Sequence, residues 1–300
     1  MKAGSGDRGP IPERPVERSG RKRLPRTDEG IVQSGSDVPS GRTADENRMA
    51  FNTEKLVEAY GAEWNLQKPE RAILESLRDR LADMRMLDIG VGRGRTTAHF
   101  GPLVKEYTGI DYAPKMIEAC RQQFRYAKVP FRFEVGDARD LHVFGDGVFD
   151  FILFSFNGLD AMTHEDRLAS FREVQRVGRR GGYFSFSSHN LDAPMKPFSL
   201  RQDRAFSGIP LWVLRRIIFI LRNREALRRA QTEDHIVFND TADGSQFRYY
   251  YIRPEAQVKQ LREIGFHEIR LFGREGEEIP DGSGTQSPLP DAWIYYLCSM

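Results

Sequence analysis

Three alternating glycines follow a short apolar stretch, and from residue 86 the sequence reads MLDIGVGRGRTT. The apolar residues predict a buried strand, and the residues after the glycines predict a helix. Gly90 and Gly92 let the backbone turn tightly and approach a ligand without a Cβ clash. A glycine turn that opens a helix also points free N–H groups at an anionic part of a ligand. The segment therefore predicts a ligand-binding strand–turn–helix unit.

Three acids lie at the ends of successive predicted strands: Asp88, Asp111 and Asp137. Asp111 follows the glycine turn by about 20 residues, a spacing suited to the two hydroxyls of a ribose. Asp88 lies two residues before the first glycine, where it would repel the pyrophosphate of a dinucleotide but tolerate cationic groups. The glycines also run G-x-G-x-G, whereas the dinucleotide pattern is G-x-G-x-x-G. Both features disfavour a nicotinamide cofactor.

This arrangement resembles the class I S-adenosylmethionine (SAM)-dependent methyltransferases, whose cofactor carries a cationic amino group and a cationic sulfonium. The resemblance implies that Gly90 and Gly92 pass under the methionine and ribose portions. It implies that Asp111 accepts hydrogen bonds from the ribose hydroxyls and that Asp137 binds the adenine amino group. The implied cofactor site comprises Asp88, Gly90, Gly92, Asp111, Tyr112, Met116, Asp137, Ala138, Ser155 and Phe156. A structural glycine turn in another α/β protein is the alternative.

Strand and helix patterns alternate along the chain, which predicts a parallel sheet covered by helices. The predicted strands are residues 84–89, 106–111, 131–135, 148–154, 183–188, 266–272 and 293–298. The last two match the sixth strand and the antiparallel seventh strand of the family. We therefore expect a Rossmann-like, seven-stranded, mostly parallel sheet with an antiparallel strand 7.

Composition divides the chain into four regions. Residues 1–45 are rich in Gly, Pro, Ser, Arg and Asp and cannot bury enough apolar surface to offset chain entropy, which predicts a disordered tail. A nucleic-acid-binding arm or a targeting peptide is the alternative. Residues 46–189 are predicted as the SAM-binding core, 190–253 as a substrate-binding insertion, and 254–300 as the end of the core.

The insertion contains a strongly apolar helix, predicted at residues 211–221. Between Arg201 and Arg229, eight arginines stand against two acids. Such a helix can lie on a membrane surface or bind an acidic partner. Its place after the fifth strand favours a lid, because ligands bind outside the carboxyl ends of parallel strands. Residues 236–238 and 247–252 predict a strand pair that completes this lid.

Methyl transfer needs a general base only where the acceptor holds its proton at the working pH. His189 ends the fifth strand on the side of the predicted site, and His164 follows the fourth strand. Asp160 could orient an amine or cap its loop. These three are the candidate catalytic residues, although most histidines are structural. Tyr249–Tyr251 alternate across a strand, so one face could stack on an aromatic acceptor or pack in the core.

The residues after the fourth strand read Ser155-Phe156-Asn157-Gly158. They lack the Pro-Pro-aromatic pattern of methyltransferases that act on amino groups of nucleic-acid bases. We therefore expect a small-molecule acceptor, with nitrogen and oxygen both open as the methylated atom. A nucleic-acid or protein methyltransferase that uses the basic insertion is one alternative. A protein that binds SAM without catalysis is the other.

Composition limits the partners. The formal net charge is +2, which implies no general affinity for nucleic acid or membrane. Two distant cysteines indicate a reducing compartment and no zinc site. No apolar run reaches the roughly 18 residues of a membrane span. We expect a cytoplasmic enzyme without a metal or a transmembrane segment, which could form a homodimer.

Overall fold

The computed structural model describes residues 49, 51–60, 64–193, 211–240, 247–279 and 291–300. The chain divides into two units, Met1–Ser36 and Asp37–Met300, and every described element belongs to the second. The predicted tail, residues 1–45, lies outside the described residues.

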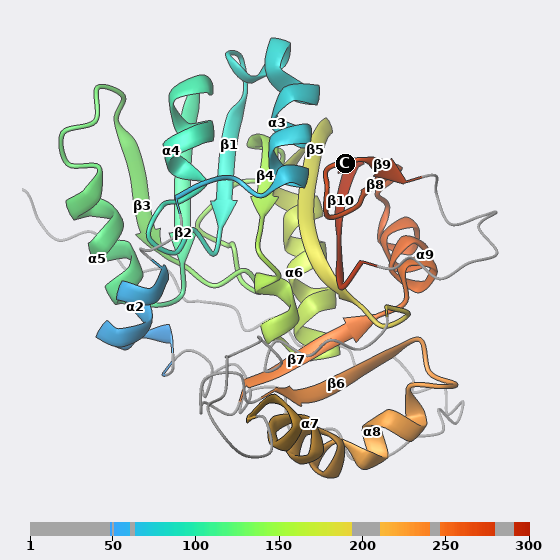
Figure 1. The fold of residues 1–300 in the computed structure, drawn as a ribbon. Helices are drawn as coiled ribbons and strands as arrows, with labels where there is room; N and C mark the ends of the chain where they lie inside the picture. Colours follow the sequence, from blue (N-terminus) through green and yellow to red (C-terminus); the bar gives the residue numbers. More distant parts are fainter. Residues whose placement is uncertain (1–48, 50, 61–63, 194–210, 241–246, 280–290) are drawn as a thin grey trace, which may run out of the picture. The chain divides into compact units, whose positions relative to one another are not determined.

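A mixed sheet forms the centre of the second unit (Figure 1), in the strand order β3-β2-β1-β4-β5-β10-β8-β9. Strands β1 to β5 are parallel, whereas β10 runs antiparallel to both β5 and β8. The predicted parallel core and antiparallel last strand are therefore confirmed. The bounds are β1 Arg85–Ile89, β2 Glu106–Asp111, β3 Phe131–Val135, β4 Phe149–Phe154, β5 Gly178–Asn190, β8 His267–Phe272, β9 Glu278–Ile279 and β10 Trp293–Ser299.

Helices cover both faces of this sheet, so its central strands are apolar on both sides. Met86 and Phe151 face a cluster with α3 (Lys68–Leu81) and α5 (Pro114–Gln123). The neighbouring Leu87 and Ile152 face a cluster with α6 (His164–Val177) and α9 (Pro254–Ile264). Two short helices, α2 (Glu54–Tyr60) and α4 (Thr97–Phe100), lie before and after β1 along the chain.

Strand β5 is longer than the predicted 183–188, and the insertion adds strands to the sheet. His189 and Asn190 of β5 pair in parallel with Tyr251 and Ile252 of β7 (Phe247–Ile252). Strand β7 in turn pairs antiparallel with β6 (His235–Asp240), which confirms the predicted strand pair. The hairpin therefore continues the sheet beyond the seven expected strands.

Two helices of the insertion, α7 (Leu211–Arg222) and α8 (Arg224–Arg229), lie below the β6–β7 hairpin in Figure 1. Phe219 of α7 packs on Phe238 of β6 with ring centroids 5.8 Å apart. The opposite side of α7 exposes Ile217, Ile220 and Leu221. No helix within the described ranges is long and apolar enough to cross a membrane.

Candidate active site

The glycine turn lies at the carboxyl end of β1 and depends on left-handed backbone. Gly90, Gly92 and Gly94 have φ of 65°, 56° and 87°, which L side chains rarely adopt. A Cβ on Gly90 would lie 2.9 Å from the ring of Phe154. Among the described residues, a Cβ on Gly92 would meet only Tyr60, at 3.8 Å. The backbone at Gly92 therefore leaves room for a ligand to approach closely.

Asp111 ties the end of β2 to this turn. Its Oδ2 accepts a hydrogen bond from Gly92 N–H at 3.0 Å, and its Oδ1 accepts one from Ala113 N–H at 2.8 Å. Burial raises the pKa of Asp111 to about 6, although both hydrogen bonds act in the opposite direction. The carboxylate is thus held at the strand end with oxygen lone pairs still available.

Asp88 lies deeper than a ligand-facing acid would. Its side chain is buried, and its Oδ2 accepts hydrogen bonds from the hydroxyls of Tyr107, at 2.6 Å, and Thr96. Burial raises the pKa of Asp88 to about 6. Thr96 opens α4, so Asp88 fixes the backbone just after the glycine turn. Its contact with a cofactor stays a prediction.

The adenine-side candidates lie around β3 and α5. Asp137 forms an ion pair with Arg139, whose Nη2 lies 2.6 Å from Oδ2, and Arg139 also reaches Asp166 of α6. Ala138 and Met116 are buried, and Tyr112 is half-buried. An adenine amino group would therefore meet a carboxylate that already has a cationic partner.

A buried charge pair lies at the carboxyl end of β4, and the sequence did not point to it. Glu70 of α3 accepts two hydrogen bonds from the Arg95 guanidinium, at 2.5 and 2.6 Å. Ser155 also donates to Glu70, and the Tyr295 hydroxyl lies 3.2 Å from it. Glu70 caps the start of α3, where it accepts a hydrogen bond from Gln67 N–H. One signal for a further, buried role was present in the sequence: this acid lies among the apolar residues of α3.

Phe156 and Asn157 follow β4 in left-handed backbone, with φ of 55° and 58°. Such conformations are strained for residues other than glycine and cluster at functional sites. The Phe156 ring is 37% exposed, and the Arg95 guanidinium lies 5.3 Å from its centre. The strand end therefore turns sharply and leaves an aromatic ring accessible.

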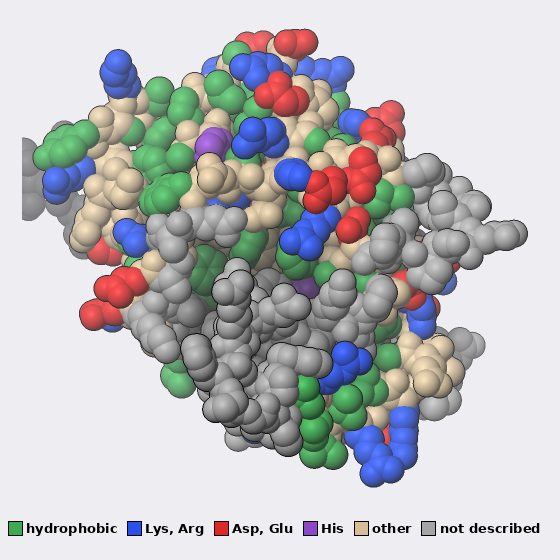
Figure 2. Space-filling view, viewed as in Figure 1, with side chains coloured by type: hydrophobic (Ala, Val, Ile, Leu, Met, Phe, Trp, Pro, Cys, Tyr) green, Lys and Arg blue, Asp and Glu red, His purple; other side chains and the backbone are tan. Residues whose placement is uncertain are grey.

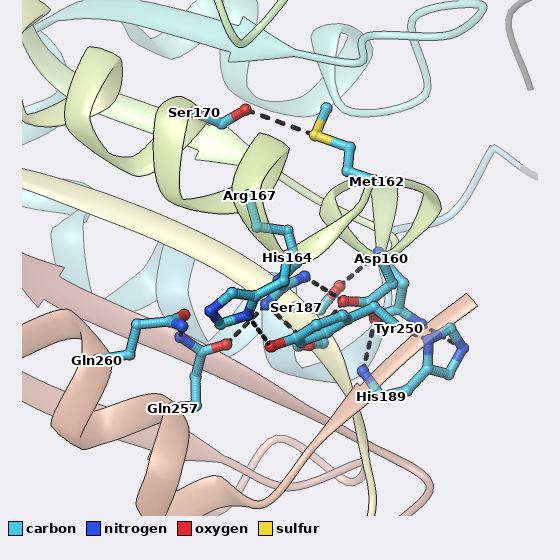
Figure 3. Close-up of polar contacts among 12 residues, drawn as sticks. Asp160, Met162, His164, Arg167, Ser170, Ser187, His189, Tyr250, Gln257 and Gln260 are labelled. Carbon is cyan, nitrogen blue, oxygen red and sulfur yellow. Dashed lines mark hydrogen bonds and ion pairs between the residues drawn. The ribbon is translucent and has the colours of Figure 1, made fainter. Parts of the chain in front are cut away.

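Asp160 and His189, both candidates from the sequence, are in contact (Figure 3). Asp160 is fully buried in the short helix η2 (Gly158–Ala161). Its Oδ2 accepts a hydrogen bond from the His189 backbone N–H at 2.6 Å and lies 2.7 Å from His189 Nδ1. On the other side of the ring, His189 Nε2 lies 3.4 Å from Asn157 Nδ2. The imidazole is thus fixed between a carboxylate and the loop after β4.

Arg167 holds Asp160 from the opposite side. Its guanidinium donates to Asp160 and, at 2.7 Å, to Gln257 Oε1 of α9, and it lies 4.3 Å from the Tyr250 ring centre (Figure 3). Arg167 is fully buried, as are the apolar residues Phe171, Val174 and Val177 of the same helix. The buried face of α6 therefore includes the ion pair of Arg167 with Asp160.

His164 lies against the insertion instead of joining Asp160 and His189. Its Nδ1 lies 2.8 Å from the Tyr250 hydroxyl, and its ring stacks on His235 with centroids 4.2 Å apart. Burial lowers the pKa of His235 to about 4, and the nearby His164 adds to this decrease. The contacts of His164 therefore connect α6 to the β6–β7 hairpin.

Comparison with known proteins identifies the domain. Residues 86–182 match the family model of a methyltransferase domain. An uncharacterized methyltransferase of Bacillus subtilis, YcgJ, is 35% identical over 109 residues, which are 36% of this chain and 42% of that protein. The chain thus spans less than half the length of this relative.

Two solved structures are similar in fold. The 1,6-didemethyltoxoflavin-N1-methyltransferase of Burkholderia thailandensis, with bound 1,6-didemethyltoxoflavin and S-adenosylhomocysteine, has a TM-score of 0.55 at 16% identity, over 89% of this chain and 92% of that chain. A SAM-dependent methyltransferase of Clostridium acetobutylicum has a TM-score of 0.51 at 16% identity, over 85% and 98%. At this identity the likeness shows the fold alone, an α/β Rossmann-like sheet with antiparallel C-terminal strands and an insertion.

Proposed function

Because residues 86–182 are a class I SAM-dependent methyltransferase domain, we propose that this protein transfers a methyl group from SAM to a nitrogen or oxygen atom of a small-molecule acceptor. One observation carries the proposal. The glycine turn follows β1 and Asp111 ends β2, while Asp160 follows β4 and His189 lies near the end of β5, so all of them lie at the carboxyl edge of neighbouring parallel strands. Ligands of open α/β sheets bind at this edge.

The residues of the first two strand ends fit the cofactor. The open side of Gly92 allows the close approach that the methionine and ribose portions require, and Asp111 retains lone pairs for the ribose hydroxyls. Tyr112 and Asp137 would contact the adenine, with the Ala138 N–H. Ser155 and Phe156 would flank the methionine end. SAM, when bound, supplies a methyl group on a sulfonium, which is a good leaving group.

His189 is the base that the geometry favours. Asp160 lies at Nδ1 and orients the ring, so Nε2, which faces Asn157, is the nitrogen that would take a proton from the acceptor. The Arg167 guanidinium donates a hydrogen bond to Asp160 and holds it in place. His164 is assigned a structural role, because it stacks on His235 and contacts Tyr250.

The acceptor is proposed to be a small molecule for two reasons. Residues 155–158 lack the pattern of base-modifying enzymes, and the Burkholderia thailandensis enzyme of similar fold is a 1,6-didemethyltoxoflavin-N1-methyltransferase. On the face shown in Figure 2, basic and acidic side chains are interspersed over the described upper part, without the continuous basic track that nucleic-acid binding requires.

Isotope labelling tests this function. The protein is incubated with trideuteromethyl-SAM and a small-molecule cell extract, and mass spectrometry follows labelled products together with S-adenosylhomocysteine (SAH). We expect a labelled product, and His189→Ala should lower its rate by about 10²- to 10⁴-fold at unchanged SAH affinity. The exposed His142 provides a matched control, since His142→Ala should leave the rate unchanged. SAH binding without any labelled product would indicate a non-catalytic SAM-binding protein.

A further inference from the structure

Aromatic side chains from four separate segments gather where the methyl group would be transferred. We call Phe51, Tyr60, Tyr112, Phe156 and Tyr249 the aromatic edge. Phe51 and Tyr60 come from the α2 segment, Tyr112 follows β2, Phe156 follows β4, and Tyr249 lies on β7 of the insertion. The strands that carry them all end at the edge occupied by the glycine turn and His189.

Contacts link the first part of the aromatic edge to the glycine turn. The Phe51 ring lies 5.9 Å from that of Tyr60 and 6.0 Å from that of Tyr112. Tyr60 lies over Gly92, because a Cβ there would meet its ring at 3.8 Å. These rings therefore border the open side of the turn.

Tyr249 extends the aromatic edge to the candidate base. Its ring centroid lies 5.4 Å from that of His189. Burial raises the pKa of Tyr112 most strongly. Asp111, Tyr60 and Tyr249 add to this increase in that order, so Tyr249 also acts on the Tyr112 hydroxyl. His189 in turn contacts Asn157, the neighbour of Phe156. Tyr249 thus lies beside the candidate base, and Phe51, Tyr60 and Tyr112 lie beside the glycine turn.

The exposure of these rings distinguishes them from core aromatics. Tyr60 is 38% exposed and Phe156 37%, and Tyr112 and Tyr249 are half-buried. Tyr250, one position along β7, is instead fully buried against Arg167. Phe156 keeps its ring accessible despite strained backbone. Core packing accounts for Tyr250 but leaves the aromatic edge with apolar surface that a ligand could cover.

Two charge pairs near the aromatic edge are internally neutral. Asp160 pairs with Arg167, both fully buried, and the buried Glu70 pairs with the half-buried Arg95. We therefore expect the rings of the aromatic edge to recognise the acceptor, because aromatic rings favour offset or edge-to-face contact with another aromatic ring.

We propose that the acceptor is a planar, uncharged aromatic molecule with an ionisable N–H or O–H group, which stacks on Tyr249 and Tyr60 and presents that group to His189. This substrate class rests on the proposed function. The proton of the acceptor passes to His189 Nε2, its freed lone pair forms the new bond to the methyl carbon, and the carbon–sulfur bond breaks to leave SAH.

Two probes of the same carbon skeleton separate aromatic recognition from general hydrophobicity. Calorimetry in saturating SAH compares 2-naphthol with decahydro-2-naphthol, the more hydrophobic of the pair. We expect 2-naphthol to bind about tenfold more tightly. Tyr249→Leu should remove most of this preference and Tyr249→Phe should keep it. The control variant is Tyr126→Leu. Tyr126 lies just after α5 and is 84% exposed, so its substitution should leave the preference for 2-naphthol unchanged.

The wild-type protein alone can overturn the inference. It does so if the two probes bind equally, or if the saturated probe binds more tightly. A preference that survives Tyr249→Leu would also overturn it. These outcomes leave the proposed function intact, because SAH binding is measured in a separate titration of the protein without probe. If SAH itself fails to bind, the proposed function fails and the acceptor class fails with it.

Discussion

Asp111 is buried, yet its proposed hydrogen bonds with the ribose hydroxyls require an ionised carboxylate. Its pKa of about 6 means that the carboxyl group protonates just below neutral pH, while the ribose hydroxyls of a cofactor would donate to the ionised form. A ligand that prefers the ionised form competes with the proton. Cofactor affinity should therefore be constant above pH 6 and fall as the pH decreases below it.

Calorimetric titration of SAH between pH 5 and 8 measures this dependence. Asp111→Asn should bind more weakly at pH 7 and lose the dependence. Asp88 has a similar pKa, so Asp88→Asn shows whether it contributes. An affinity that is independent of pH in the wild-type protein would contradict the role of Asp111.

Arg167 gives a second test at a single residue. It is fully buried with Asp160, and removing one partner of such a pair leaves an uncompensated charge, which costs about 3–5 kcal/mol. Arg167→Met should lower the free energy of unfolding in urea by this amount. Arg172→Met, exposed on the same helix, should change it by less than about 0.5 kcal/mol. Equal effects of the two substitutions would contradict the buried pair.

The sequence predicted the residues that belong to a local pattern and missed those that depend on distant partners. The glycine turn and Asp111 stand at fixed spacings along one strand–turn–helix unit, and the structure brings them into contact. Arg167 reads as one more polar residue of α6, because Gln257 is far away in the sequence. Glu70 and Arg95 were missed for the same reason.

Among the elements, helix and strand ranges with strong periodicity were predictable, whereas pairing was not. The strand pair of the insertion follows from its alternating residues, and α7 follows from its apolar run. The parallel pairing of β7 with β5 is made by backbone groups of His189 and Asn190 and leaves no sequence pattern. The extension of β5 by His189 and Asn190 beyond the predicted range has this cause.

The β6–β7 hairpin should detach more readily in acid. His235 has a pKa of about 4, lowered by burial and by His164, so it stays neutral in the fold. The unfolded chain takes up this proton near pH 6.5, and stability is therefore full above pH 6.5 and lost as the pH falls towards 4. Glu233 and Asp234 oppose the shift, and Arg167 adds to it.

Thermal melting between pH 7 and 5 checks this expectation. The loss of Tm should be smaller in His235→Phe, which keeps a ring against His164 without the titrating group. His267→Phe, exposed on β8, serves as the control and should follow the wild-type protein. Identical pH profiles for the wild-type protein and His235→Phe would contradict the account.

For the whole molecule, both ligands are proposed to bind at one edge of one sheet. The cofactor residues lie at the ends of β1, β2, β3 and β4, and His189 of β5 and Tyr249 of β7 continue the same edge. The fold class was predictable because alternating strand and helix patterns permit few topologies. The sequence also indicated that the insertion contributes to this edge through Tyr249–Tyr251, but the pairing of β7 with β5, which places them there, was not predictable.

Calorimetric titration of SAH into the wild-type protein and Asp111→Ala tests the central claim most directly. Asp111 lies at a strand end and does not pack a core, so the variant should fold. We predict that SAH binds the wild-type protein and that Asp111→Ala weakens binding by about 1.5–3 kcal/mol, the range for hydrogen bonds to a charged group. Asp140→Ala, an exposed acid on the loop after β3, should bind as the wild-type protein does. Unchanged affinity in Asp111→Ala would contradict the assignment of the cofactor to this edge.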